Sequence, residues 1–243
     1  MIQDLLKDLN KYVTGIGSLP AIRVNQTESK MELQSISPDK QLVVFGFSDS
    51  KFSTDETTFG MGQLDLLQKI LDCPEYEENA VISLGRDTDS KLSKVDFSNP
   101  AGDFTNSYRL MSKPLLDTLM PEIKFLGSKW NLELAPSLAA IKRFNLQAAA
   151  NSDETSFIIK LVKGNLEVSF GTPATHSGKF IFAEGVNAGK VTESAFPVAV
   201  FQKVLNLTAH AATATIKLTE GLMCVEMNSG LITYHFFIPA LSK

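Results

Sequence analysis

The chain has 243 residues, of which 44% are hydrophobic and 21% are charged, a balance typical of a soluble globular protein with one large or two ordinary domains. Its 27 acidic and 23 basic residues give a net charge of −4, which argues against a surface that is basic throughout but allows a local basic surface. No run approaches the ~20 apolar residues that cross a bilayer, and the start of the chain lacks the pattern of a signal peptide, so we expect a cytoplasmic protein. Cys73 and Cys224 give neither a disulfide framework nor a CxxC metal pair, and we expect them to be reduced.

The first part of the chain is predicted to hold two helices and five strands. Residues 4–13 carry Leu5, Leu6, Leu9 and Val13 at the spacing of an amphipathic helix, with charged residues on the opposite face. A shorter helix of the same kind is expected over residues 62–71. Alternation of apolar and polar residues predicts strands over residues 30–34, 41–47, 80–84, 92–97 and 104–111.

Residues 112–128 follow neither the helical nor the strand period and contain Pro114, Pro121 and Gly127. Prolines and glycines in such a segment are typical of a loop, so we expect a connector between two domains, residues 1–111 and 129–243. Its three leucines, Leu115, Leu116 and Leu119, are expected either to pack back on a sheet or to form a short turn of helix.

The second part of the chain is predicted to repeat the plan of the first. A helix is expected over residues 136–150, with Pro136 in its first turn and Leu138, Ile141 and either Phe144 or Leu146 facing inward. A shorter helix is expected over residues 197–207. Strands are expected over residues 157–162, 166–170, 179–184, 213–218, 222–228 and 231–238. Turn-forming residues at 163–165, 219–221 and 228–230 indicate antiparallel hairpins, and the whole pattern predicts an α+β fold.

Short matches in the same order along the chain indicate that a domain has been duplicated. Residues 6–10 (Leu-Lys-Asp-Leu-Asn) match residues 141–145 (Ile-Lys-Arg-Phe-Asn) at an offset of 135. Residues 67–71 (Leu-Gln-Lys-Ile-Leu) match residues 201–205 (Phe-Gln-Lys-Val-Leu) at an offset of 134, and the offset shrinks to 126 by Tyr108 and Tyr234. A slowly shrinking offset is what loop insertions in the first copy would produce.

Signals for catalysis are weak. The three histidines, His176, His210 and His235, belong to no HExxH motif and have no cysteine at metal-ligand spacing, and no phosphate-binding GxxxxGK[ST] motif occurs. The acidic stretches 72–78 and 86–89 are expected to be solvated surface loops. We therefore expect no enzyme, no metal and no cofactor.

The positive signal is a set of basic residues on the polar faces of the four predicted helices. Lys7 matches Lys142 and Lys69 matches Lys203 across the two copies. Lysine is also a common solubilising residue on exposed helices, and acidic neighbours could account for its presence. The alternative is that four helices face one polyanion and neutralise its phosphates without reading bases. The bases expected to face duplex DNA are Lys7, Lys11, Lys69, Lys142, Arg143 and Lys203.

With these features the chain resembles the ring-forming DNA sliding clamps, most of all the two-domain clamps of tailed bacteriophages. The resemblance rests on the size, the duplicated domain of two helices and an antiparallel sheet, the connector, and the segments 5–7, 15–16, 231–234 and 238–240. Two departures are a first helix that leaves almost no room for an opening strand, and a long loop over residues 85–105 that we expect to lack a counterpart in the second copy.

The resemblance implies a non-enzymatic head-to-tail homotrimer that encircles duplex DNA, tethers a replicative DNA polymerase and is loaded by an ATP-dependent clamp loader. It also implies a pocket for partner peptides beside the connector and the C-terminus, and by position the pocket residues would be Leu119, Met120, Ile238, Pro239, Ala240 and Leu241. The alternative is a phage structural protein whose duplicated domains form a ring or tube without DNA contact.

Overall fold

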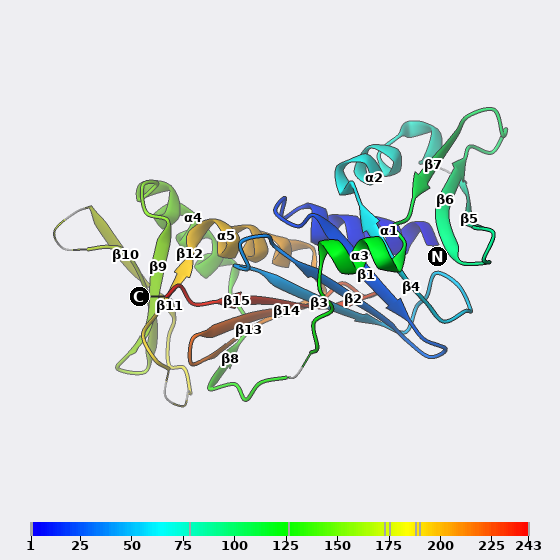
Figure 1. Cartoon of the computed structure of the whole chain (residues 1–243). Helices are drawn as coiled ribbons and strands as arrows, with labels where there is room; N and C mark the ends of the chain where they lie inside the picture. The colour runs from blue at the N-terminus through cyan, green and yellow to red at the C-terminus, as the bar shows by residue number, and fades with distance from the viewer. Residues whose placement is uncertain are drawn as a thin grey trace. The chain divides into compact units, whose positions relative to one another are not determined.

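Figure 1 shows the computed structural model of the chain, which describes residues 2–77, 79–125, 127–172, 174, 176–187, 189 and 191–242. The chain forms two units, which are described separately. Unit 1 comprises residues 1–38, 44–124 and 231–233, and unit 2 comprises residues 39–43, 125–230 and 234–243.

Unit 1 consists of helices and two antiparallel groups of strands. The strand order is β4-β1-β2-β3 in one group and β5-β6-β7 in the other. Helix α1 buries Leu5, Leu6 and Leu9, and the amphipathic spacing of these leucines explains why the segment forms a helix against a core. The elements are α1 (Ile2–Leu9), the π-helical η1 (Asn10–Thr14), β1 (Ala21–Gln26), β2 (Met31–Ile36), β3 (Val43–Ser48), β4 (Thr57–Gly62), α2 (Leu64–Leu71), the 3-10 turn η2 (Pro74–Tyr76), β5 (Val81–Arg86), β6 (Leu92–Ser98), β7 (Thr105–Arg109) and α3 (Lys113–Leu119).

Unit 2 has strands in the orders β11-β10-β9-β12 and β15-β14-β13-β8. Lys163 and Gly164 both adopt positive φ, the conformation of a two-residue hairpin turn, and they join β9 to β10 as the sequence predicts. The elements are β8 (Leu132–Leu134), α4 (Leu138–Ala150), β9 (Ser156–Val162), β10 (Asn165–Gly171), β11 (Ser177–Ala183), β12 (Ser194–Pro197), α5 (Val198–Leu207), the 3-10 turn η3 (Thr208–His210), β13 (Thr213–Thr219), β14 (Leu222–Asn228) and β15 (Thr233–Pro239).

The core of unit 2 centres on Phe144 of α4, which is fully buried. Its ring meets Phe157 of β9 and Phe201 of α5 edge-to-face, each with centroids 4.9 Å apart, and it lies 5.5 Å from Phe170 of β10. Edge-to-face aromatic pairs add about 0.5–1.5 kcal/mol each beyond the burial of their surface. This cluster fixes α4 and α5 on the strands.

Helix α3 and the residues that follow it are seated on three residues that lie opposite one another across neighbouring strands of unit 1. Arg23 of β1 pairs in register with Gly60 of β4 and Gln34 of β2. Arg23 is fully buried, and its Nη2 donates to Asp117 Oδ1 and to the carbonyl oxygen of Met120, both at 2.7 Å. Its Nη1 and Nε have no hydrogen-bond partner among the described atoms.

The neighbours of Arg23 complete this seat. Gly60 leaves room for Leu116, because a Cβ at residue 60 would lie 2.9 Å from Leu116 Cδ1. Gln34 Oε1 accepts from the N–H of Ile123 at 3.1 Å. The hydrogen bonds of Asp117 with Lys113 and with Arg23 lower the pKa of its carboxyl. Helix α3 and the chain after it are therefore fastened to unit 1.

Several predictions about local structure are wrong. Helix α4 begins at Leu138 with Ser137 as its N-cap, so Pro136 precedes the helix. Leu138 and Leu146 are 71% and 70% exposed, and the buried residues of α4 are Ala140, Phe144 and Ala148. The helix is apolar on most sides, so the spacing of its leucines does not identify the inward face.

Two segments differ from the expected loops and boundaries. The span 85–105 is not one long loop, because it contains β6, which confirms the strand predicted over residues 92–97 and pairs with β5 on one side and β7 on the other. Helix α2 starts at Leu64, since Gly62 still belongs to β4. Strands β1, β4, β8 and β12 were not predicted from the sequence.

Candidate nucleic-acid interface

All six basic residues expected to face DNA are exposed and lie on helices. Lys7 lies on α1, Lys11 on η1 and Lys69 on α2, all in unit 1. In unit 2, α4 carries Lys142 and Arg143, and α5 carries Lys203. Each unit therefore presents basic side chains from a pair of neighbouring helical segments.

The two helical segments of each unit are joined by an amide–amide hydrogen bond at matching sequence positions. In unit 1 the Nδ2 of Asn10 donates to Gln68 Oε1. In unit 2 the Nε2 of Gln202 donates to Asn145 Oδ1 at 3.0 Å, and Asn145 also donates to Asn206 Oδ1 at 2.9 Å. In both units the asparagine lies three residues after one matched lysine, and the glutamine directly precedes the other. The bond thus holds each pair of basic helices in a fixed relation.

The two units differ in the acidic residues that accompany these bases. The segments of unit 1 contain three basic residues and three acidic ones, Asp4, Asp8 and Asp65. Helices α4 and α5 contain three basic residues and no aspartate or glutamate. The helical surface of unit 2 therefore has the stronger positive potential, which favours contact with a polyanion.

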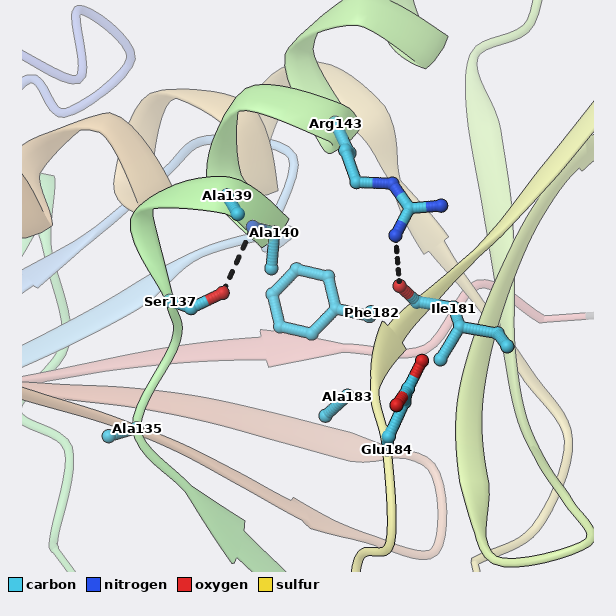
Figure 2. Close-up of a pocket in the computed structure, with 9 residues that line it drawn as sticks. All are labelled: Ala135, Ser137, Ala139, Ala140, Arg143, Ile181, Phe182, Ala183 and Glu184. Atoms are coloured by element: carbon cyan, nitrogen blue, oxygen red, sulfur yellow. Dashed lines mark hydrogen bonds between the residues drawn. The ribbon is translucent and has the colours of Figure 1, made fainter.

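The side chain of Arg143 is held against β11. Its Nη1 donates to the carbonyl oxygen of Ile181 at 3.4 Å, and its guanidinium lies 5.4 Å from the centroid of the Phe180 ring. Figure 2 shows Arg143 pointing from α4 toward β11 beside a pocket of about 330 Å³ that Ser137 and Glu184 also line. The guanidinium thus has a structural role in addition to its charge, so replacing Arg143 would test more than charge.

The residues expected to form a peptide pocket fall in both units. Leu119, in unit 1, is 50% exposed, whereas Met120 beside it is buried. In unit 2, Ile238 is buried and Pro239, Ala240 and Leu241 are half-buried. Met120 and Ile238 thus belong to the core, whereas Leu119, Pro239, Ala240 and Leu241 retain exposed surface.

Leu241 also lines a cavity that sequence reasoning did not foresee. The cavity measures about 750 Å³ and lies in unit 2 between the end of α4, the start of α5 and Gln41. The N–H of Leu241 donates to the carbonyl oxygen of Ala195 in β12 at 2.8 Å, and the N–H of Ala240 donates to that of Gly221 at 2.9 Å. These bonds hold the C-terminal segment at the rim of the cavity.

Within the part of the chain that the structure describes, no three His, Cys, Asp or Glu side chains are grouped so that they could hold a metal ion. None of the described helices combines the length and the apolar character that a membrane span requires. Burial raises the pKa of the Cys224 thiol to about 12, so this cysteine is a protonated core residue.

Neither the scan against protein-family models nor the search of curated proteins found a match. Among solved structures, the chain is similar to a chain of the complex of the C-terminal region of FEN-1 bound to A. fulgidus PCNA. The two chains are 15% identical, the match covers 99% of this chain and 96% of the other, and the TM-score is 0.72. Over nearly its whole length, the chain therefore has the fold found in this PCNA complex.

Proposed function

We propose that the chain is a sliding clamp of the kind found in tailed bacteriophages, a cytoplasmic, non-enzymatic homotrimer that encircles duplex DNA and tethers a replicative DNA polymerase. An ATP-dependent clamp loader would place it on DNA. The observation that carries the proposal is the PCNA-like fold together with matched lysines on two pairs of helices. The resemblance to the phage clamps in the order of helices, strands and connector along the sequence supports the same proposal.

We further propose that the chain is a duplicated domain with copies over residues 1–111 and 129–243 and a connector over residues 112–128. Three features support this. After β8, unit 2 repeats the order of unit 1, which is a helix, four strands, a helix and three strands. The strand orders of the two units correspond, and the Asn–Gln hydrogen bond recurs at equivalent sequence positions.

A trimer is favoured because two domains are too few to close a ring, whereas a head-to-tail contact repeated by rotation can close one. Strands β7 and β11 each end the strand order of their sheet, so both offer edges that a ring contact could pair. Light scattering at micromolar concentration should give three times the chain mass. A stable monomer or an open-ended tube would contradict the proposal.

A ring explains how a protein with a net charge of −4 can hold DNA, because encirclement retains the duplex without strong binding. Weak contacts of helix lysines with phosphates permit sliding, since they read no bases. The direct test is retention on nicked circular DNA after loading, followed by release when the DNA is linearised. A ring that forms normally but is never retained on circular DNA would favour the structural-protein alternative.

Partner capture is proposed near Leu119 and the C-terminal residues 239–241. Replacing Leu119 with glutamate, or deleting residues 241–243, should leave the trimer intact and abolish binding of the polymerase tail peptide in a fluorescence titration. The matched control is Leu115→Glu, because Leu115 is 56% exposed on the same helix but outside the proposed pocket. Unaltered peptide binding by both test variants would place the pocket elsewhere, and loss of the trimer would make these residues structural.

A further inference from the structure

In unit 2 the strand β13 is paired with a neighbouring strand along each of its two edges. It pairs with β14 along one edge and with β8 along the other, where Ile216 lies opposite Leu134 and Leu218 opposite Leu132. Ile216 and Leu218 are consequently 1% and 2% exposed. The short strand β8 therefore completes the burial of β13.

Strand β5 holds the corresponding position in unit 1 but is paired along one edge alone. It pairs with β6 in the order β5-β6-β7, and no strand of the described residues lies along its other edge (Figure 1). Ile82 lies opposite Phe97 and Leu84 opposite Val95, and both partners are buried. Ile82 and Leu84 thus belong to the inward row of the sheet, yet they are only half-buried. They lack the cover that β8 gives to β13.

The sequence of β5 does little to protect this edge. Natural edge strands carry lysine, proline or a bulge, or are covered by another segment, and these features prevent unwanted strand pairing. Strand β5 reads Val-Ile-Ser-Leu-Gly-Arg, with no proline or charge before Arg86, and its bulge lies at the far end between Gly85 and Arg86. Val81, at the start of the strand, is 58% exposed. Four uncharged residues of high or moderate strand propensity are therefore available to a new neighbour.

We propose that the free edge of β5 is a docking site for an extended segment of a partner protein, which adds a strand in the place that β8 occupies in unit 2. Main-chain hydrogen bonds would supply much of the affinity, and alternate side chains would supply specificity. By analogy with Leu132 and Leu134, the segment carries two apolar residues that cover Ile82 and Leu84. The residue between them is small or polar, because it lies beside the exposed Ser83. The inference rests on the proposed correspondence of the two copies, but it does not depend on the clamp function.

Charge around the edge defines the flanks of this segment. In sequence order, the exposed charged residues include Asp72, Glu75 and Glu77 before β5 and Asp87, Asp89 and Lys91 after it, so the acidic residues outnumber the lysine. Arg86 forms an ion pair with Asp55, so its charge is offset locally. Lysines or arginines on both sides of the apolar pair would therefore complement the docking site.

The same charges argue against a second copy of this chain as the occupant. If two β5 edges paired antiparallel with residue 81 of one copy opposite residue 86 of the other, the stretch that contains Glu77 in one copy would approach the stretch 87–89 of the other. Both stretches are acidic, and like charges brought together disfavour the contact. A basic partner segment meets no such repulsion.

The test uses the intact protein and a synthetic peptide with the pattern basic-basic-Leu-Ser-Leu-basic-basic. Hydrogen–deuterium exchange should show that the amides of residues 81–86 exchange on the order of tenfold more slowly at saturating peptide, because new strand pairing protects them. A peptide with proline in place of both the serine and the leucine after it should give no protection, since one of two adjacent N–H groups must face β5 and proline cannot donate to the ladder.

Two protein variants sharpen the test. Val81→Lys places a positive charge on the edge and should weaken binding by about fivefold or more, whereas Val162→Lys, at a 36% exposed strand position in unit 2, should not. Glu77→Gln combined with Asp89→Asn should also weaken binding, and the loss should shrink at high salt.

The outcomes separate the proposal from its alternatives. Protection of β5 by the serine peptide alone supports it. No protection at millimolar peptide, protection elsewhere instead, equal binding of the proline peptide, or unchanged affinity of Val81→Lys would overturn it. Protection of residues 81–86 that rises with protein concentration in the absence of peptide would identify a second copy as the occupant and would overturn it as well.

Discussion

The helix lysines give the sharpest test of the proposed DNA contact, because the chain supplies its own matched control. Replacing Lys142 and Lys203 with glutamine removes charge from helices that carry no acidic residue. Replacing Lys7 and Lys69 removes the same charge from the matching positions of unit 1, where three aspartates offset the bases. Glutamine retains helix propensity, so both double variants should fold normally.

The expected loss of DNA affinity can be calculated from the release of counterions by lysine–phosphate contacts. Each lysine that contacts a phosphate contributes about −0.9 to the slope of log K against log salt concentration. One such contact therefore makes the affinity about eightfold higher at about 0.1 M salt relative to about 1 M salt. The unit 2 pair should therefore reduce the slope by up to ~1.8 per chain that contacts DNA. We expect a smaller reduction for the unit 1 pair, since the local field there is already close to neutral. Stability should change by no more than about 0.5 kcal/mol in either case.

Binding to duplex DNA would be measured by fluorescence anisotropy between about 50 and 200 mM salt, where phosphate contacts dominate. Thermal melting and light scattering of each variant provide the structural controls. An unchanged salt slope for the Lys142 and Lys203 variant would refute the proposal that these lysines contact DNA. A larger reduction of the slope for the Lys7 and Lys69 variant would refute the argument from local charge.

Three further predictions concern the folded chain. Phe144→Ala should lower the free energy of unfolding by about 3–5 kcal/mol, measured by urea titration, because it empties the centre of an aromatic cluster; a loss below 1 kcal/mol would mean that the site collapses around the gap. Gly60→Ala should cost about 1–3 kcal/mol, since the new methyl would press on Leu116, and a neutral result would show that α3 can shift. Burial lowers the pKa of His235, although Glu226 opposes the shift, so the unfolded chain takes up this proton first and stability falls as pH drops below about 6.5. His235→Phe should remove that part of the pH dependence of the melting temperature, and an unchanged profile would assign it to another group.

Local chemistry in the sequence was enough to locate the four main helices and several hairpin turns in the second part of the chain. The inward leucines of α1 repeat every three or four residues, and its charged residues lie on the opposite face. This spacing fits a helix and does not fit a strand. The positive-φ turn at Lys163 and Gly164 likewise depends on neighbouring residues alone. The exposure of the six basic residues follows from their charge, since charged side chains are seldom fully buried.

Burial in α4 and in β1 could not be deduced in this way. Helix α4 is rich in alanine and has leucines on its outer side, so Phe144 is buried because of the rings that surround it in unit 2. Strand β1 contains the fully buried Arg23, a residue that a sequence pattern places on the surface. Its burial requires Asp117, which lies 94 residues away along the chain.

The sequence by itself determined the order of the helices, the repeated lysines and the duplicated pattern, because helix and turn preferences and residue matches are properties of the chain read along its length. Only the tertiary structure decided which polar groups pair across the fold. The Asn–Gln bonds that join the helices, the contacts of α3 with Gly60 and Arg23, and the uncovered edge of β5 all depend on residues far apart in sequence. Contacts of this kind arise when chain segments pack, and no local period encodes them.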